Sequence, residues 1–234
     1  MSLRRRDRDR FVTALFAPAD RREDLFTLYE FNQEIARVRE TVSEAMLGQI
    51  RLQWWRENIG AAGHPTAESL GELLTRHPGL RPFIDRLIDA REFDLLDRPL
   101  ADEAELKSYV EDSAAALTEA ACLLLGAADA ATLEAAREVG RGWGLLGLMR
   151  AQPVLGRLPE IEGKTLADQV RSHLKAARKQ RVDRAALPAL LPAKLADSYL
   201  KSFRKAGNDL ANREWSAQNS RPLRLLLANS LGRF

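Results

Sequence analysis

Cysteine is nearly absent from this chain of 234 residues, in which Cys122 stands alone. A single thiol excludes an internal disulfide framework and any metal site built from several cysteines. Cys122 lies in the apolar run 121–125, and a free cysteine among apolar residues behaves as a small hydrophobic side chain. We therefore expect Cys122 to be buried in the core rather than reactive.

Long hydrophobic runs and a large excess of one charge are missing too. The chain has 36 basic and 33 acidic residues, which give a net charge of +3. This balance argues against a nucleic-acid-binding protein, because such proteins concentrate basic residues on one face. No apolar stretch reaches the roughly 20 residues of a membrane-spanning helix, and residues 1–10 lack the apolar segment of a signal peptide. We expect a cytoplasmic protein, at most peripheral to the inner face of a membrane.

The alternating apolar and polar pattern of half-buried strands is also not found. Apolar residues instead recur at spacings of three and four, as at Leu25, Leu28 and Ile35, which is typical of amphipathic helices. A short first helix should end near residue 18, and Ser43 should cap the start of a later one. Segment 152–164, rich in proline and glycine, should be the clearest long connection. Further helices are expected at 66–77, 80–95, 102–125, 130–149, 165–179, 193–206 and 222–231, within one all-α domain formed by residues 1–234.

A resemblance becomes visible at residues 29–40, YEFNQEIARVRE, and 48–56, GQIRLQWWR. They resemble the opening helices of the squalene/phytoene synthase family, whose enzymes join two isoprenoid diphosphates head to head. In that family a D-D-x-x-D cluster follows, and its carboxylates hold magnesium on the diphosphate. The resemblance places this cluster on residues 36–40. Only Glu40 is acidic there, because Ala36, Arg37 and Arg39 occupy other positions of the cluster.

The second metal motif of the family is similar to residues 139–151, VGRGWGLLGLMRA. The resemblance places the family's glutamine and asparagine on Gly144 and Gly147, and its first metal-binding aspartate on Ala151. The first metal motif therefore keeps one carboxylate, that of Glu40, and the second keeps none. The resemblance then implies a protein without catalytic residues or a metal site and without a cofactor, Mg²⁺ being needed only if the chain is an enzyme after all.

Four arginines occupy or flank the former metal positions and are predicted as phosphate ligands, since guanidinium groups suit phosphate: Arg37, Arg39, Arg141 and Arg150. The glycines of 139–151 are unusual for a helix, where glycine costs stability relative to alanine. They favour close packing between helices, and a ligand groove is the alternative interpretation.

Residues 31–40 and 48–56 are most similar to a non-catalytic branch of the family, which includes a mitochondrial assembly factor for respiratory complex I. The resemblance is clearest over residues 10–160. It implies an isoprenoid-synthase-type helical bundle with a central cavity. It also implies an assembly or interaction factor, a pseudoenzyme whose partners are respiratory-chain subunits or assembly factors. The alternatives are a prenyltransferase acting on isoprenoid diphosphates, and a non-catalytic protein that binds an isoprenoid or lipid.

Two surface features complete the sequence-based predictions. Trp54 and Trp55 are adjacent, so on a helix their side chains point about 100° apart. We expect one ring in the core and the other on a flank.

Residues 171–184 are rich in lysine and arginine. A solvated helix face is the favoured interpretation, and contact with anionic lipid head groups or an acidic partner is the alternative.

Overall fold

The computed structural model describes residues 3–96, 98–216 and 222–234, the side chains of 222–224 excepted. These residues form helices and no strand, which confirms the predicted all-α class. No helix in this part of the chain is long and apolar enough to cross a membrane. The α-helices are α1 (Leu3–Arg6), α2 (Arg8–Ala14), α3 (Ala19–Ala36), α4 (Ala45–Glu57), α5 (Pro65–Arg76), α6 (Arg81–Ala90), α7 (Glu103–Val110), α8 (Ala116–Leu124), α9 (Ala130–Leu155), α10 (Gly163–Ala177), α11 (Leu187–Leu190), α12 (Pro192–Lys205) and α13 (Pro222–Ser230).

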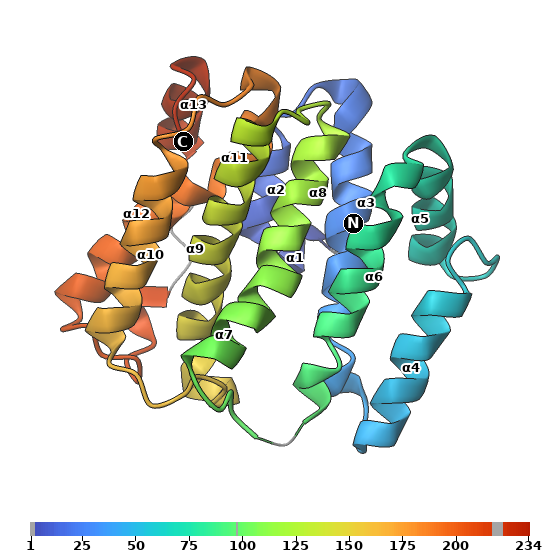
Figure 1. Cartoon of the computed structure of the whole chain (residues 1–234), viewed down its shortest axis with the longest axis horizontal. Helices are drawn as coiled ribbons and strands as arrows, with labels where there is room; N and C mark the ends of the chain where they lie inside the picture. Colours follow the sequence, from blue (N-terminus) through green and yellow to red (C-terminus); the bar gives the residue numbers. More distant parts are fainter. Residues whose placement is uncertain (1–2, 97, 217–221) are drawn as a thin grey trace.

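The long helix α9 lies in the middle of the bundle (Figure 1). It packs against α8 on one side and α10 on the other, while α3 packs against both α8 and α5. Helices α4 and α5 form one end of the molecule, and α10, α12 and α13 form the other. The resulting arrangement leaves the C-terminal ends of α3, α6 and α9 near one another at one pole of the bundle.

The core contains the residues that helical periodicity assigned to it. Leu25, Leu28 and Ile35 are at most 1% exposed, and Cys122 is fully buried, as predicted. Burial raises the pKa of the Cys122 thiol well above its ordinary value, so the thiol stays protonated and unreactive.

The tryptophan pair also behaves as predicted. Trp55 is 2% exposed and meets the Phe31 ring edge-on at a centroid distance of 5.4 Å. Trp54 is only partly buried and packs against the outside of the core. Each ring lies against the other and against His64, which forms the N-cap of α5.

Some predicted boundaries are wrong. The helix predicted at 80–95 ends at Ala90, and a separate 3₁₀ turn, η3 (Phe93–Leu95), follows it. The helix predicted at 130–149 continues past Pro153 and ends before Gly156, whose φ of 58° provides the left-handed stop that glycine adopts easily. The connection predicted at 152–164 is shorter for that reason. Glu44 rather than Ser43 is the N-cap of α4, and it makes no side-chain capping bond.

The helix predicted at 102–125 is continuous, but a π-helical turn, η4 (Glu111–Ala115), interrupts its α-helical geometry. Such turns occur often at functional sites. The turn packs against α9 and α6, and Ser113 and Ala114 within it face the cavity described next.

Candidate functional site

A cavity of about 470 Å³ lies among the helices. The resemblance implied such a cavity inside the bundle. Its lining includes Ala36 and Glu40 of the first motif. It also includes Gly144, Gly147 and Ala151 of the second motif. Segments more than 100 residues apart in the chain are therefore brought to one site, where the resemblance placed two facing metal clusters.

The end of α3 determines how the first motif meets this cavity. The helix stops at Ala36, and the chain continues as a 3₁₀ turn, η1 (Arg39–Thr41). Arg37 therefore pairs with the exposed Glu40, Nε to Oε2 at 3.3 Å, and does not line the cavity. Arg39 does line it, and among the described residues its guanidinium donates only one long bond, of 3.5 Å, to the carbonyl oxygen of Val42.

The glycines of α9 divide into two groups. A Cβ added at Gly140 would lie 2.4 Å from Cα of Ala115, and one at Gly144 would lie 2.6 Å from Cβ of Ala114. These glycines allow α9 to approach the π turn closely, which supports the packing interpretation. A Cβ at Gly147 would meet no atom within 4 Å. Gly147 therefore borders open space in the cavity, which supports the groove interpretation at this position.

Three of the four arginines that were predicted as phosphate ligands lie outside the cavity lining. Arg141 pairs with Glu111, Nε to Oε2 at 2.6 Å, on another side of α9. Arg150 pairs with the buried Asp9 at 3.3 Å. Neither lines the cavity, because successive helical positions point in different directions. Of the four predicted phosphate ligands only Arg39 lies in the site, and its binding of phosphate stays a prediction.

Four cavity arginines were missed: Arg6, Arg10, Arg91 and Arg157. They come from α1, from α2, from the residue after α6, and from the loop after α9. Arg6, Arg10 and Arg91 belong to no recognisable motif, and Arg91 and Arg157 lie far along the sequence from the other two. Only the preference of arginine for anionic ligands could have drawn attention to them, and 36 basic residues make that signal unspecific.

Arg91 is held in the cavity lining by three partners. Its guanidinium donates to Oδ2 of Asp94 at 3.2 Å, to the hydroxyl of Tyr109 at 2.9 Å and to Oδ1 of Asn32 at 3.2 Å. The Tyr109 hydroxyl in turn donates to Oδ1 of Asp94 at 2.9 Å. Burial alone would lower the pKa of Arg91, but Tyr109 and Asp94 raise it. The side chain therefore stays charged and fixed in position.

The residues of this cavity do not fit a magnesium site. Mg²⁺ requires oxygen ligands in octahedral geometry, and enzymes supply carboxylates together with substrate phosphates. The only carboxylates in the described lining belong to Glu40 and Asp94. Glu40 is paired with Arg37, and Asp94 accepts from Arg91 and Tyr109. No cluster of three or more potential metal ligands occurs among the described residues.

The chain aligns with known proteins over most of its length. NADH dehydrogenase (ubiquinone) complex I, assembly factor 6, from Homo sapiens is 26% identical over 254 residues, which cover 93% of this chain and 76% of the relative. The protein from Bos taurus gives the same values. The homologue of this factor in Drosophila melanogaster is 25% identical over 278 residues, covering 97% of this chain and 81% of its own length.

A solved structure shows the same fold. A dehydrosqualene synthase in complex with ligand superimposes with a TM-score of 0.78, over 98% of this chain and 93% of that chain, at 14% sequence identity. This likeness establishes the isoprenoid-synthase-type architecture. The profile of the squalene/phytoene synthase family matches residues 3–159, about two thirds of the sequence. By these observations the chain belongs to the squalene/phytoene synthase family.

Proposed function

We propose that this protein is a non-catalytic member of its family that acts as an assembly or interaction factor in the biogenesis of respiratory complex I. Its partners are complex I subunits or other assembly factors. The names of the relatives support this proposal, because they describe assembly factors of complex I and align over 93% or more of this chain.

The observation that carries the non-catalytic assignment is the donor set of the cavity. A metal-dependent prenyl synthase needs carboxylates from two facing helices to hold metal ions on the diphosphate. Here Ala36 and Ala151 stand at two of those positions, and the two carboxylates present are engaged by other side chains. Departure of a diphosphate without metal ions would lose a large electrostatic stabilisation of the transition state.

An interaction factor needs an exposed contact surface, and α4 provides one at the edge of the molecule (Figure 1). Met46, Leu47 and Ile50 are 67%, 47% and 60% exposed. Their spacing places them on one face of the helix. Contiguous exposed apolar groups are typical of protein–protein interaction sites. We assign the α4 surface, defined by these three residues, to a protein partner.

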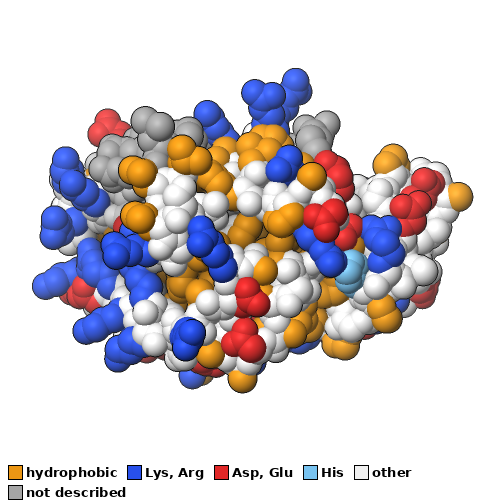
Figure 2. Space-filling view, turned by 90° about the horizontal axis from the view of Figure 1, so that it is seen from above, with side chains coloured by type: hydrophobic (Ala, Val, Ile, Leu, Met, Phe, Trp, Pro, Cys, Tyr) orange, Lys and Arg blue, Asp and Glu red, His pale blue; other side chains and the backbone are white. Residues whose placement is uncertain are grey.

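The opposite end of the molecule is basic. Figure 2 shows lysine and arginine side chains gathered at one end of the molecule. The exposed basic residues on α10 and α12, or directly after α10, include Arg171, Lys175, Lys179, Lys201 and Arg204. Anionic lipid head groups attract such clusters by about 1 kcal/mol per basic residue near the surface. This face supports a peripheral contact with an anionic membrane, which co-sedimentation with phosphatidylglycerol vesicles and with phosphatidylcholine vesicles tests. Equal sedimentation with both would argue against it.

Affinity capture of the tagged full chain, with the recovered proteins identified by mass spectrometry, tests the assembly role. Wild type should recover complex I subunits or assembly factors. Ile50→Glu should lose them, because it puts a charge in the centre of the α4 surface. Leu226→Glu is the matched control, since Leu226 is 53% exposed on the distant α13. Equal recovery by both variants would exclude α4, and no complex I protein in any sample would refute the role.

An activity assay separates this proposal from the prenyltransferase alternative. Purified protein is incubated with farnesyl or geranylgeranyl diphosphate and Mg²⁺, and released diphosphate is measured. We expect release at the rate of the protein-free control. Release above that rate, lost on addition of a chelator, would establish a metal-dependent transferase and overturn the non-catalytic assignment.

A further inference from the structure

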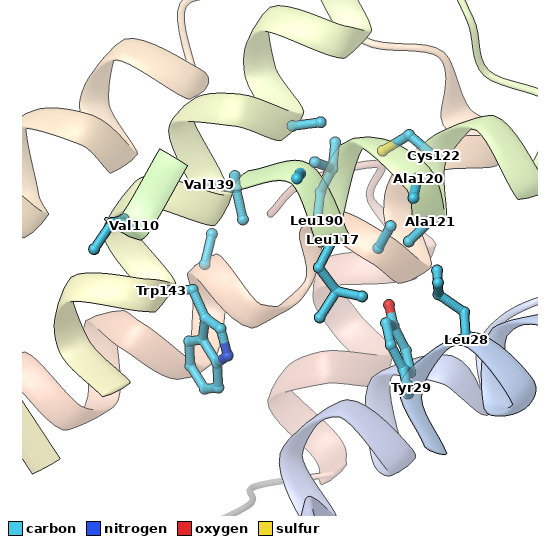
Figure 3. Packing of buried hydrophobic residues seen from close by; sticks show 14 of the residues in the cluster. Leu28, Tyr29, Val110, Leu117, Ala120, Ala121, Cys122, Val139, Trp143 and Leu190 are labelled. Carbon is cyan, nitrogen blue, oxygen red and sulfur yellow. The ribbon is translucent and has the colours of Figure 1, made fainter. Parts of the chain in front are cut away.

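Helix α4 lies outside the central part of the core. The labelled core side chains in Figure 3 come from α3, α7, α8, α9 and α11, and none of them comes from α4. Helix α4 lies at the edge of the molecule (Figure 1) and turns one face inward, where Gly48, Leu52 and Trp55 are buried. Its outer face is therefore open to a partner.

The outer face of α4 carries a ridge between two grooves. Met46, Ile50 and Trp54 follow one another at spacings of four residues and form the α4 ridge. A groove of about 490 Å³ and a groove of about 450 Å³ both border Ile50 and Trp54. Gln53 lines the first groove and Arg51 the second. Two positions apart is more than half a turn of helix, so the grooves lie on opposite flanks of the ridge.

The two grooves differ in charge. The first, which we call the acidic groove, is lined by Glu57 and Glu92. The guanidinium of Arg56 in its lining donates to both Asp89 and Glu92 at 2.6 Å, so its charge is neutralised there. The second, the basic groove, is lined by Arg51 and by no carboxylate among the described residues. Charge complementarity then requires a partner with opposite charges on its two flanks.

This relief fits a helix. The side-chain rows of a second helix, also at four-residue spacing, enter the grooves beside such a ridge. The backbone groups of α4 are bonded along the helix, so α4 offers no strand edge to which an extended segment could add. A helix bound in this way is anchored by apolar residues at spacings of three and four.

We propose that the α4 surface binds one amphipathic helix of a protein partner, which lies across the α4 ridge. The apolar row of the partner helix fills the two grooves. Its acidic flank faces Arg51, and its basic flank faces Glu57. This inference rests on the proposed contact between the α4 surface and a protein partner, and it holds for whichever respiratory protein supplies the helix.

Three synthetic helical peptides test the proposal. They share one leucine face and differ in their flanks. The mixed peptide has glutamate on one flank and lysine on the other, and the other two carry only glutamate or only lysine. Fluorescence anisotropy of the labelled peptides measures their binding to the full chain. We expect saturable binding of the mixed peptide with one site per chain. The other two should bind about fivefold more weakly, because each places like charges over one groove.

Three variants of the chain locate the contact. Ile50→Glu should weaken binding of the mixed peptide about tenfold or more, because it puts a charge in the apolar centre of the ridge. Arg51→Glu makes both grooves acidic, so the all-lysine peptide should then bind more tightly than the mixed peptide. Arg181→Glu is the matched control, since Arg181 is exposed and lines neither groove. Thermal unfolding establishes that the variants are folded.

Several results would overturn this docking mode. One is the absence of saturable binding of the mixed peptide. Another is an unchanged order of the three peptides in the folded Arg51→Glu variant. Analytical ultracentrifugation of the chain alone provides a third, because a dimer that Ile50→Glu abolishes would identify a second copy of this chain as the occupant of α4.

Failure of this docking mode is distinguishable from failure of the assembly role. If affinity capture recovers complex I proteins but the mixed peptide does not bind, the helical docking mode is wrong and the assembly role stands. If the mixed peptide binds as expected but no complex I protein is recovered, the assembly role fails and the docking mode stands.

Discussion

The phenol of Tyr199 donates a hydrogen bond of 2.8 Å to Oδ2 of Asp9, which lies 190 residues earlier in the chain. Arg150 donates to the same oxygen at 3.3 Å, and its guanidinium lies 4.4 Å from the centroid of the Tyr199 ring. The other oxygen of Asp9 is buried without a partner among the described residues. This cluster joins α2, α9 and α12 and so ties the N-terminal helices to the far end of the bundle.

Asp9 makes stability depend on pH. Burial raises its pKa above the ordinary 3.8, and the Tyr199 hydrogen bond and the Arg150 charge offset that effect only in part, while the nearby Asp7 adds to it. The folded protein therefore keeps this proton to a higher pH than the unfolded chain does. The contribution of Asp9 to the free energy of unfolding is largest below pH 3.8 and falls as the pH rises through the raised pKa.

We predict that Asp9→Asn removes this component of the pH dependence. Urea unfolding of wild type and variant between about pH 3 and pH 7 measures it. The free energy of unfolding of wild type minus that of the variant should decrease with increasing pH. A difference that is constant, or that increases with pH, would contradict the raised pKa.

The two groups of glycines in α9 lead to opposite predictions for alanine. Gly140→Ala should destabilise the protein by about 1–3 kcal/mol, because its Cβ would clash with the backbone of Ala115 and the helices would have to separate. Gly147→Ala should be neutral or stabilising by up to about 1 kcal/mol, since alanine favours the helix and the added methyl group meets nothing. Urea unfolding distinguishes them, and equal effects would contradict the packing difference.

Restoring carboxylates should restore metal binding. Ala36, Arg39 and Ala151 line one cavity, so changing all three to Asp should create Mg²⁺ affinity that wild type lacks. Calorimetric titration with MgCl₂ measures it. The matched control replaces the exposed Ala101, Ala211 and Arg204 by Asp, which changes the net charge equally outside the cavity. Equal Mg²⁺ affinity in the two triple variants would refute the mapping of the two motifs.

The tryptophan pair should divide into a structural and a peripheral residue. Trp55→Ala should cost about 3–5 kcal/mol, because it leaves a cavity beside Phe31 in the core. Trp54→Ala should cost clearly less, since that side chain is partly exposed. Thermal or urea unfolding measures both. A larger loss of stability from Trp54→Ala than from Trp55→Ala would contradict the placement of Trp55 in the core and of Trp54 at its edge.

Helix identity was predictable because helix formation is local. The spacing of Leu25, Leu28 and Ile35 is set by 3.6 residues per turn, which requires no knowledge of neighbouring segments. Boundaries were less predictable. The helix after Leu80 stops at Ala90, and the following turn brings Asp94 to Arg91 and Tyr109. The end of the helix at Ala90 reflects side-chain partners from other helices, and no local sequence pattern predicts it.

The sequence by itself determined that the chain is helical and that the two metal motifs lack the aspartates of the family. An alanine or arginine in place of an aspartate has lost its metal-binding oxygens whatever the fold. Tertiary structure alone decided which side chains replace them. Arg6, Arg91 and Arg157 reach the cavity because α1, α6 and the loop after α9 pack around it, whereas Arg141 and Arg150 point elsewhere from the same helix that carries Gly147. Direction around a helix and packing between helices are properties of the folded chain, so they decide which charges meet in the cavity.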